Sequence, residues 1–312
     1  MSENVTAPGT EPLRFGLVGV DSPHAPSFAR LLGDGRTGAV RGARVALAWR
    51  GVAAPDFPLS RDRIDDLAAD VSALGVAWCA SPEEVAERCD AVLVVASDAR
   101  THPDSFHRVV DSGRPVYVDT RFALSSADAR AMLDAARRTG ALPLAGSPKR
   151  FTPEFRAATA PGGPAERIDL VGPLPTQPGH PVLDWYGVHL VDLAVAAMGP
   201  GVVRVDARPD HPVILTWDDG REATLTGDAR WSPTTRGSVR TSDGSRRDLA
   251  IHAGEPMLVG LLEALVTACR TGVPTVPLDE VLTVVAVVEA ARASRLCGEA
   301  VQVEPQPHQP RS

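Results

Sequence analysis

The stretch LRFGLVGVDSPHAPSFARLL, residues 13–32, decides the fold of this chain. An apolar run, Leu13–Gly19, leads into a glycine turn and then into a pattern typical of a helix. Further apolar runs follow in the first half of the chain, at Ala43–Trp49, Ala91–Ala96, Pro115–Asp119 and Leu142–Gly146. Helical patterns separate them, at Ser81–Arg88, Pro103–Ser112 and Ser126–Thr139. Short apolar strands that alternate with helices predict a parallel sheet with both faces covered, which is a doubly wound α/β domain.

The second half of the chain has a different pattern. Strand-like runs follow one another with few helices between them, at Ile168–Val171, Val202–Arg208, Val213–Trp217, Glu222–Gly227, Ser238–Thr241 and Arg247–Ile251. Two helices, Pro256–Thr271 and Asp279–Cys297, close the chain, and Gly298 is typical of a helix C-cap. This order predicts an α+β domain with an open, mostly antiparallel sheet.

We therefore expect two continuous domains, a doubly wound domain over residues 13–148 and a second domain over residues 149–303. A length of 312 residues is consistent with two domains. Residues 1–12 and 304–312 are polar and rich in proline, and we expect them to be disordered.

Composition excludes several classes of protein. Hydrophobic residues make up 44% and charged residues 23%, which is ordinary for a soluble globular protein. The net charge of −7 and the absence of a long basic run argue against a nucleic-acid partner. No window approaches 18 consecutive apolar residues, and the first residues lack the features of a signal peptide, so we expect no membrane partner and a cytoplasmic location.

A glycine turn between a first strand and a helix is the place of the dinucleotide fingerprint G-x-G-x-x-G. In this chain the three glycine positions are occupied by Gly19, Asp21 and His24. The second glycine normally lets the backbone approach the pyrophosphate, and the third allows close packing of helix on strand. An Asp21 carboxylate about 4 Å from a phosphate charge would cost about 4 kcal/mol at an effective dielectric near 20. Alternatively, Asp21 turns away and caps the helix together with Ser22, with Pro23 as the first helical residue.

Two further positions of the first domain bear on cofactor binding. Arg50 follows the second strand, where an acidic residue would hold ribose hydroxyls and an arginine suits a 2′-phosphate. Arg50 thus favours NADP over NAD, unless it is a solvated strand end. Asp98, His102 and His107 lie close in sequence, but no metal-ligand spacing occurs, so we expect no metal site. We expect His102 to line the cleft after the fourth strand.

The segment Gly113–Ala123, GRPVYVDTRFA, resembles G-K-H-V-x-x-E-K-P-x-A of the glucose–fructose oxidoreductase/inositol dehydrogenase (Gfo/Idh/MocA) family. Gly187–Asp192, GVHLVD, matches the G-x-H-x-x-D of that family. Ser81–Val94 is similar to its approach to the fourth strand, and Gly272–Ala291 resembles its C-terminal helices. The order and spacing of these segments, from about Leu13 to Val303, carry the resemblance.

The resemblance implies a Rossmann domain that binds NAD or NADP and a C-terminal substrate domain whose open sheet makes homo-oligomer contacts, in a dimer or a tetramer. The expected substrate is a small, sugar-like molecule with a hydroxyl or carbonyl group. The expected cofactor-binding residues are Gly19, Val20, Asp21, Ser22, His24, Arg50, Ala96, Asp98, His102, Asp119 and Thr120.

The chain departs from the family at its E-K-P lysine, which assists proton transfer at the substrate hydroxyl. Asp119, Thr120 and Arg121 replace the glutamate, lysine and proline. Threonine is not a titratable acid/base near neutral pH, so either that role has moved or the reaction is not an ordinary alcohol oxidation. Lys149 is the only lysine and follows a strand whose carboxyl end lies beside the cofactor edge of a doubly wound sheet. It either replaces the missing lysine or is exposed at a domain junction.

His189 and Asp192 are three residues apart and share one face of a helix. A histidine can exchange a proton near neutral pH, and Asp192 would orient it. A purely structural pair is the alternative, and the match to G-x-H-x-x-D favours catalysis, with Lys149 or Asp119 assisting.

Two hypotheses of function follow. One is an NAD(P)-dependent oxidoreductase, which the His189 motif favours. The other is a redox-silent relative that acts as a redox-neutral lyase or as a ligand-binding or partner subunit, which the missing lysine and glycines favour.

Overall fold

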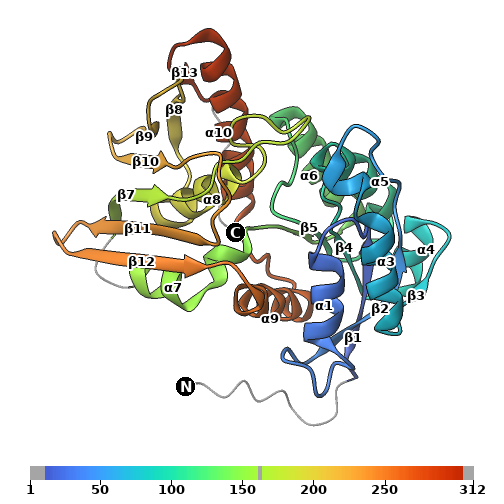
Figure 1. Cartoon of the computed structure of the whole chain (residues 1–312). Helices are drawn as coiled ribbons and strands as arrows, with labels where there is room; N and C mark the ends of the chain where they lie inside the picture. The colour runs from blue at the N-terminus through green and yellow to red at the C-terminus, as the bar shows by residue number, and fades with distance from the viewer. Residues whose placement is uncertain (1–10, 161–163, 305–312) are drawn as a thin grey trace. The chain divides into compact units, whose positions relative to one another are not determined.

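The structure is a computed structural model that describes residues 11–160 and 164–304 (Figure 1). The expected disordered ends lie outside these residues, apart from residues 11, 12 and 304. The described chain forms two compact units. Unit 1 takes its described residues from Met1–Asp119, Leu133–Leu144 and Leu258–Thr275, and unit 2 from Thr120–Met132, Ala145–Met257 and Val276–Ser312. The units interleave in the sequence, whereas the composition pattern predicts two continuous domains, because packing joins segments that are far apart in the chain.

Unit 1 is built on a six-stranded parallel sheet with the order β3-β2-β1-β4-β5-β6. Its strands are β1 (Leu13–Val18), β2 (Ala43–Trp49), β3 (Ala77–Trp78), β4 (Ala91–Val94), β5 (Val116–Val118) and β6 (Pro143–Leu144). This is the strand order of a Rossmann domain, so the predicted doubly wound fold is confirmed. The sequence pattern misses β3, since both of its residues are exposed and form no apolar run.

Helices cover both faces of this sheet. The helices of unit 1 are α1 (His24–Leu32), α2 (Pro58–Arg61), α3 (Ile64–Ala73), α4 (Pro82–Arg88), α5 (His102–Val110) and most of α9 (Glu255–Thr271), with a 3-10 turn, η1, at Ala99–Thr101. Among them α1, α4 and α5 pack directly on its strands. α1 packs on α3, and α4 packs on α5. The connections from β1 to β2 and from β3 to β4 run in opposite directions along the sheet, so right-handed crossovers place these two helix pairs on opposite faces.

Unit 2 contains a seven-stranded sheet with the order β12-β11-β7-β10-β9-β8-β13. The strands are β7 (Ala165–Val171), β8 (Val202–Asp206), β9 (Val213–Trp217), β10 (Glu222–Thr226), β11 (Thr234–Thr241), β12 (Arg246–His252) and β13 (Val301–Gln302). Among these, β7 and β10 pair in parallel and the other neighbours pair antiparallel. The predicted, mostly antiparallel sheet is therefore confirmed.

Three helices and a 3-10 turn accompany this sheet: η2 (Pro148–Phe151), α7 (Pro153–Thr159), α8 (Gly187–Met198) and α10 (Leu278–Cys297). α8 is apolar almost all round and is buried between the sheet and α10, as such a helix must be. α10 ends at Gly298, whose φ of 73° is left-handed, which confirms the predicted C-cap.

α6 (Ser126–Thr139) begins in unit 2 and ends in unit 1. Within residues 11–160 and 164–304, no helix has the length and hydrophobicity that crossing a membrane requires.

Candidate functional site

The first candidate site lies in unit 1, where β1, β2 and β4 end. Gly19 follows β1 with a φ of 79°, and a Cβ at this position would lie 2.8 Å from the Cβ of Ala96. Only glycine fits such a turn. The strand order reverses between β1 and β4, which is the switch point at which open α/β sheets bind ligands. A pocket of about 170 Å³ opens here, lined by Gly19, Asp21, Trp49, Arg50, Gly51, Ala96, Asp98 and neighbouring residues.

Asp21, at the second glycine position, is buried and committed to the loop after β4. Its Oδ1 accepts the main-chain N–H of Ser97 at 2.8 Å, and the Ser97 hydroxyl donates to the Asp21 carbonyl at 3.0 Å. The expectation that Asp21 caps the helix is wrong. The N-cap residue is Pro23, no side chain among the described residues caps the helix, and α1 begins at His24 rather than at Pro23. Ser22, which precedes the N-cap, accepts the N–H of His24 on its Oγ at 3.3 Å.

His24, at the third glycine position, contacts the end of β5. Its Nδ1 lies 2.6 Å from Oδ2 of Asp119, and Oδ1 of Asp119 accepts the Tyr117 hydroxyl at 2.9 Å. The Asp119 side chain is only 2% exposed, whereas the His24 side chain is 23% exposed. The structure thus brings together two predicted cofactor residues, His24 and Asp119. Sequence reasoning missed Tyr117, because a tyrosine inside a buried strand is usual for a core.

Arg50 stands at the rim of the same pocket and is paired with Asp65 of α3. Both side chains are largely exposed, so the pair is weak and open to competition by an anion. Beside it, the guanidinium of Arg108 lies 5.3 Å from the centre of the Trp49 ring. Trp49 and Arg50 are therefore the side chains that β2 presents to a ligand here.

Asp98 and His102 hold the chain after β4. Asp98 is buried and paired with Arg100 at 2.7 Å, and Arg100 also binds Asp56 at 2.7 Å. His102 is completely buried, and its Nε2 donates to the carbonyl of Ala96 at 2.8 Å. The prediction that His102 lines the cleft is wrong, since a buried carbonyl at a strand end needs a donor and His102 supplies it.

The second candidate site lies in unit 2, where η2 meets α8. His189 is 8% exposed, and its Nδ1 lies 2.7 Å from Oγ of Ser147. Ser147 also caps η2 by accepting the N–H of Lys149 at 3.3 Å. Ser147 thus orients the imidazole. Sequence reasoning missed it, although Ser147-Pro148 is a helix-start pattern that marks the turn.

Asp192 does not take the predicted role of orienting His189. Its Oδ2 accepts from Nε of Arg150 at 2.8 Å, and Arg150 also binds Glu280 at 2.9 Å. The Arg150 and Asp192 side chains are buried, and the Glu280 side chain is 15% exposed. Burial raises the pKa of Asp192, and the charge of Arg150 opposes that rise. The spacing of His189 and Asp192 places both on one face of α8. The residues of η2 and its N-cap that pack against this face determine their hydrogen bonds: Ser147 binds His189, and Arg150 binds Asp192.

Lys149 is buried, so the alternative that it is an exposed residue at a domain junction is wrong. Its side chain leads into unit 2, and Nζ donates to Oγ1 of Thr235 at 2.6 Å. Burial lowers the pKa of Lys149 to about 8. An amine with such a pKa exchanges protons near neutral pH, which is what an acid/base group requires.

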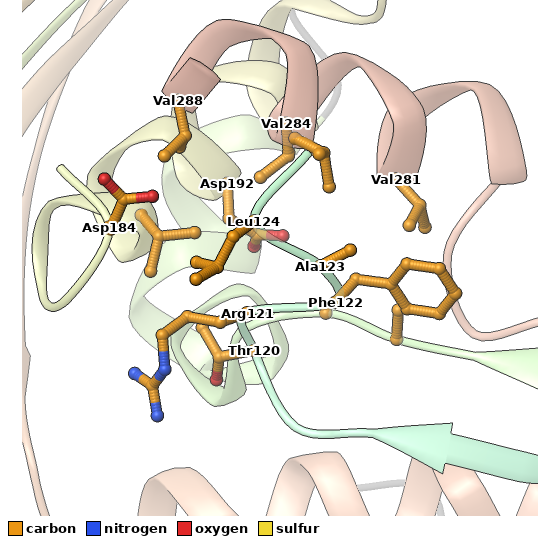
Figure 2. A pocket seen from close by; sticks show the side chains of 14 residues that line it. Thr120, Arg121, Phe122, Ala123, Leu124, Asp184, Asp192, Val281, Val284 and Val288 are labelled. Atoms are coloured by element: carbon orange, nitrogen blue, oxygen red, sulfur yellow. The ribbon is translucent and has the colours of Figure 1, made fainter. Parts of the chain in front are cut away.

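Figure 2 shows a further pocket of unit 2, where the segment from Thr120 to Leu124 faces α10. It has room for about 20 Å³, about one water molecule, so it does not hold a substrate in this form. Asp184 lines it and is paired with Arg292, and burial raises the pKa of Asp184 to about 7. Thr120 has a φ of 34°, a strained conformation for a β-branched residue and one that concentrates at functional sites.

No group of three or more His, Cys, Asp or Glu that could hold a metal ion occurs in the part of the chain that the structure describes.

Comparison with solved structures identifies proteins that share this fold. No protein-family model and no curated protein matches the chain. A probable dehydrogenase from Thermotoga maritima has 18% identity over 93% of this chain and 99% of its own, with a TM-score of 0.74. GenD2 from gentamicin A biosynthesis, in complex with NAD, has 19% identity over 95% and 97%, with a TM-score of 0.74. A myo-inositol dehydrogenase from Corynebacterium glutamicum has 18% identity over 95% and 100%, with a TM-score of 0.72.

The chain has the Gfo/Idh/MocA fold. The correspondence of Asp119-Thr120-Arg121 to the E-K-P motif remains an expectation from the sequence resemblance. The likeness at these identities concerns the fold, and the chemistry has to be argued from the residues.

Replacing Asp21 by glycine removes the acceptor of the buried Ser97 N–H. We expect the free energy of unfolding to fall by about 1–3 kcal/mol, the usual cost of leaving a buried donor unsatisfied. Denaturant unfolding measures this loss, and Asp21→Asn, which keeps an acceptor oxygen, should lose less. Equal stability of Asp21→Gly and the unchanged protein would contradict this account of Asp21.

Lys149→Met should change the pH dependence of stability. Between pH 8 and 10.5 the unfolded chain binds a proton at Lys149 that the folded chain does not, so the free energy of unfolding rises with pH in this window. At pH 7 the variant should be more stable by up to about 3 kcal/mol, and the rise should disappear. Denaturant unfolding at pH 7 and pH 10 tests this. The control variant is Arg236→Met, at an exposed position next to Thr235, and its free energy of unfolding should still rise with pH. If the free energy of unfolding of Lys149→Met rises with pH in the same way, Lys149 is solvated and does not cause the rise.

Proposed function

We propose that this protein is an NAD(P)-dependent oxidoreductase that moves a hydride between the cofactor and a hydroxyl or carbonyl group of a small, sugar-like molecule. The observation that carries the proposal is the pocket at the switch point of the unit 1 sheet, beside the close approach of Gly19 to Ala96. Proteins of the same fold support it, since GenD2 is in complex with NAD and the Corynebacterium glutamicum protein is a myo-inositol dehydrogenase.

The residues of unit 1 fit a dinucleotide. The Gly19 turn brings the main chain close to the pocket. The Asp21 carboxylate would repel a diphosphate, and one of its oxygens is held by the main-chain N–H of Ser97. Trp49 and Arg50 stand where the adenosine half is bound in such sheets. A 2′-phosphate would compete with Asp65 for Arg50, so the proposal covers both NAD and NADP.

When bound, the nicotinamide accepts or donates the hydride. The residues of unit 2 handle the proton: His189 takes up the proton of the substrate hydroxyl during oxidation and returns it during reduction. Ser147 holds Nδ1 of His189 and so fixes the ring. Lys149, whose pKa burial lowers to about 8, assists as a donor that changes its charge near neutral pH. Asp192 contributes through Arg150, by holding the helix that carries His189.

We also propose that the protein is cytoplasmic and forms a dimer or a tetramer through the sheet of unit 2. β9 supports this, since its residues alternate between buried positions such as Leu215 and half-buried ones such as Ile214 and Thr216. Such a sheet has one face packed on its helices and one face that is open to a partner.

Cofactor binding tests the proposal directly. Titration with NAD⁺, NADH, NADP⁺ and NADPH, followed by calorimetry and nicotinamide fluorescence, should give saturation with at least one form. A protein that binds none of them up to millimolar concentration is not an NAD(P)-dependent enzyme. Binding without hydride transfer to or from any polyol, sugar or keto-sugar would instead favour the redox-silent alternative, to which Thr120 in the place of a lysine points.

His189→Asn should lower kcat about 10²–10⁴-fold, the usual contribution of an acid/base group, while the Kd for the cofactor stays unchanged. Ser147→Ala should lower kcat less, because it loosens the ring without removing it. His211→Asn, at an exposed position, is the matched control and should leave kcat unchanged. If His189→Asn lowers the yield of folded protein but the folded fraction keeps full activity, the role of His189 is only structural.

A further inference from the structure

The first turn of α1 offers no main-chain donor to an anion. Pro23 and Pro26 have no N–H, and the N–H of Ser27 bonds to the Pro23 carbonyl at 3.3 Å. The N–H groups of His24 and Ala25 both bond to Ser22, to its Oγ at 3.3 Å and its carbonyl at 3.0 Å. A helix start normally binds a diphosphate through these groups. Any main-chain hydrogen bond to a diphosphate therefore comes from the turn before α1. The donors that the helix start would normally supply have to come from a side chain.

His24 is the first residue of α1, and its side chain is partly exposed at this turn. Two contacts fix its ring: Nδ1 binds Asp119 at 2.6 Å, and the ring stacks on Phe28 with centroids 5.4 Å apart. Asp119 is held in turn by the Tyr117 hydroxyl at 2.9 Å. Among the described residues, Nε2 of His24 has no hydrogen-bond partner, and the side chain is 23% exposed. A ring that is held at one nitrogen presents the other in a fixed direction.

Two arginines near this turn, Arg63 and Arg50, already bind protein groups. Arg63 donates from Nε to the Leu59 carbonyl at 2.6 Å and from Nη2 to the Asp21 carbonyl at 3.3 Å. The carbonyl of Arg50 accepts the N–H of Val20 in this turn at 3.0 Å, and its side chain is paired with Asp65. The imidazolium form of His24 carries hydrogen on both nitrogens, so it can donate through Nδ1 to Asp119 and through Nε2 to an anion.

We propose that the Tyr117–Asp119–His24 chain is the diphosphate-binding element of unit 1, in which Nε2–H of His24 donates to a diphosphate oxygen of the dinucleotide. This inference rests on the proposed cofactor function. His24 then replaces by a charged side-chain donor what a glycine turn and a helix start provide through the main chain. Asp119 and Tyr117 are positioning residues, because they reach the ligand only through His24.

The decisive comparison is between ADP-ribose, which contains the diphosphate, and adenosine, which does not. We expect His24→Leu to weaken ADP-ribose binding, measured by calorimetry, about 10- to 100-fold, the contribution of a charge-assisted hydrogen bond. Adenosine binding, measured by ligand-observed NMR, should change less than twofold. Asp119→Asn and Tyr117→Phe should show the same split between the two ligands with smaller losses, and a purely structural role would weaken both ligands alike.

His24→Arg restores a cation at the same position and should recover part of the ADP-ribose affinity, so it also tests the proposal if His24→Leu does not fold. His211→Asn is the control histidine variant and should bind both ligands as the unchanged protein does. If the unchanged protein binds neither ADP-ribose nor any nicotinamide cofactor, the proposed function fails. If it binds them, and both His24→Leu and Asp119→Asn keep the ADP-ribose affinity within twofold, the function stands and the role of His24 is overturned.

Discussion

At the ends of β1 and β4, the main chain of Gly19 passes so close to Ala96 that a Cβ on the glycine would lie 2.8 Å from the alanine Cβ. This close approach lets the chain turn from β1 into α1 at the switch point of the sheet. The neighbouring loop is fixed by the bond from Ser97 to Asp21, and the end of β5 is fixed to α1 through Asp119 and His24. The pocket of unit 1 exists because these contacts keep the two strand ends together.

The polar residues of the Gly19–His24 turn differ from the usual dinucleotide fingerprint. Two glycines of the usual fingerprint are absent, and both substituted residues are engaged with partners distant in sequence. The Asp21 carboxylate accepts the main-chain N–H of Ser97, and His24 is held by the buried carboxylate of Asp119. The proposed anion site therefore rests on a side-chain network instead of a bare backbone, which makes it dependent on each of its members.

Unit 2 keeps ionisable groups in its interior at a cost in stability. Burial lowers the pKa of Lys149 to about 8 and raises the pKa of Asp184 to about 7, so both are poised to change charge near neutral pH. Arg150 pairs with both Asp192 and Glu280. Removing one member of such a cluster leaves the charge of another without its partner in a poorly solvated place, which is strongly destabilising. Groups with pKa values shifted in this way are candidates for chemistry.

The sequence by itself indicated most strands of both sheets, the doubly wound class of the first and caps such as Gly298, because apolar periodicity and turn residues act over a few neighbouring positions. It missed the two-residue strands β3 and β13, which are too short to show a pattern. Only the tertiary structure decided the partners: Asp119 for His24, Arg150 for Asp192 and Thr235 for Lys149, which lie 95, 42 and 86 residues apart. Periodicity tells which face a side chain occupies. It carries no information about which group faces it across the packed interior, and that group sets its charge, its orientation and its chemistry.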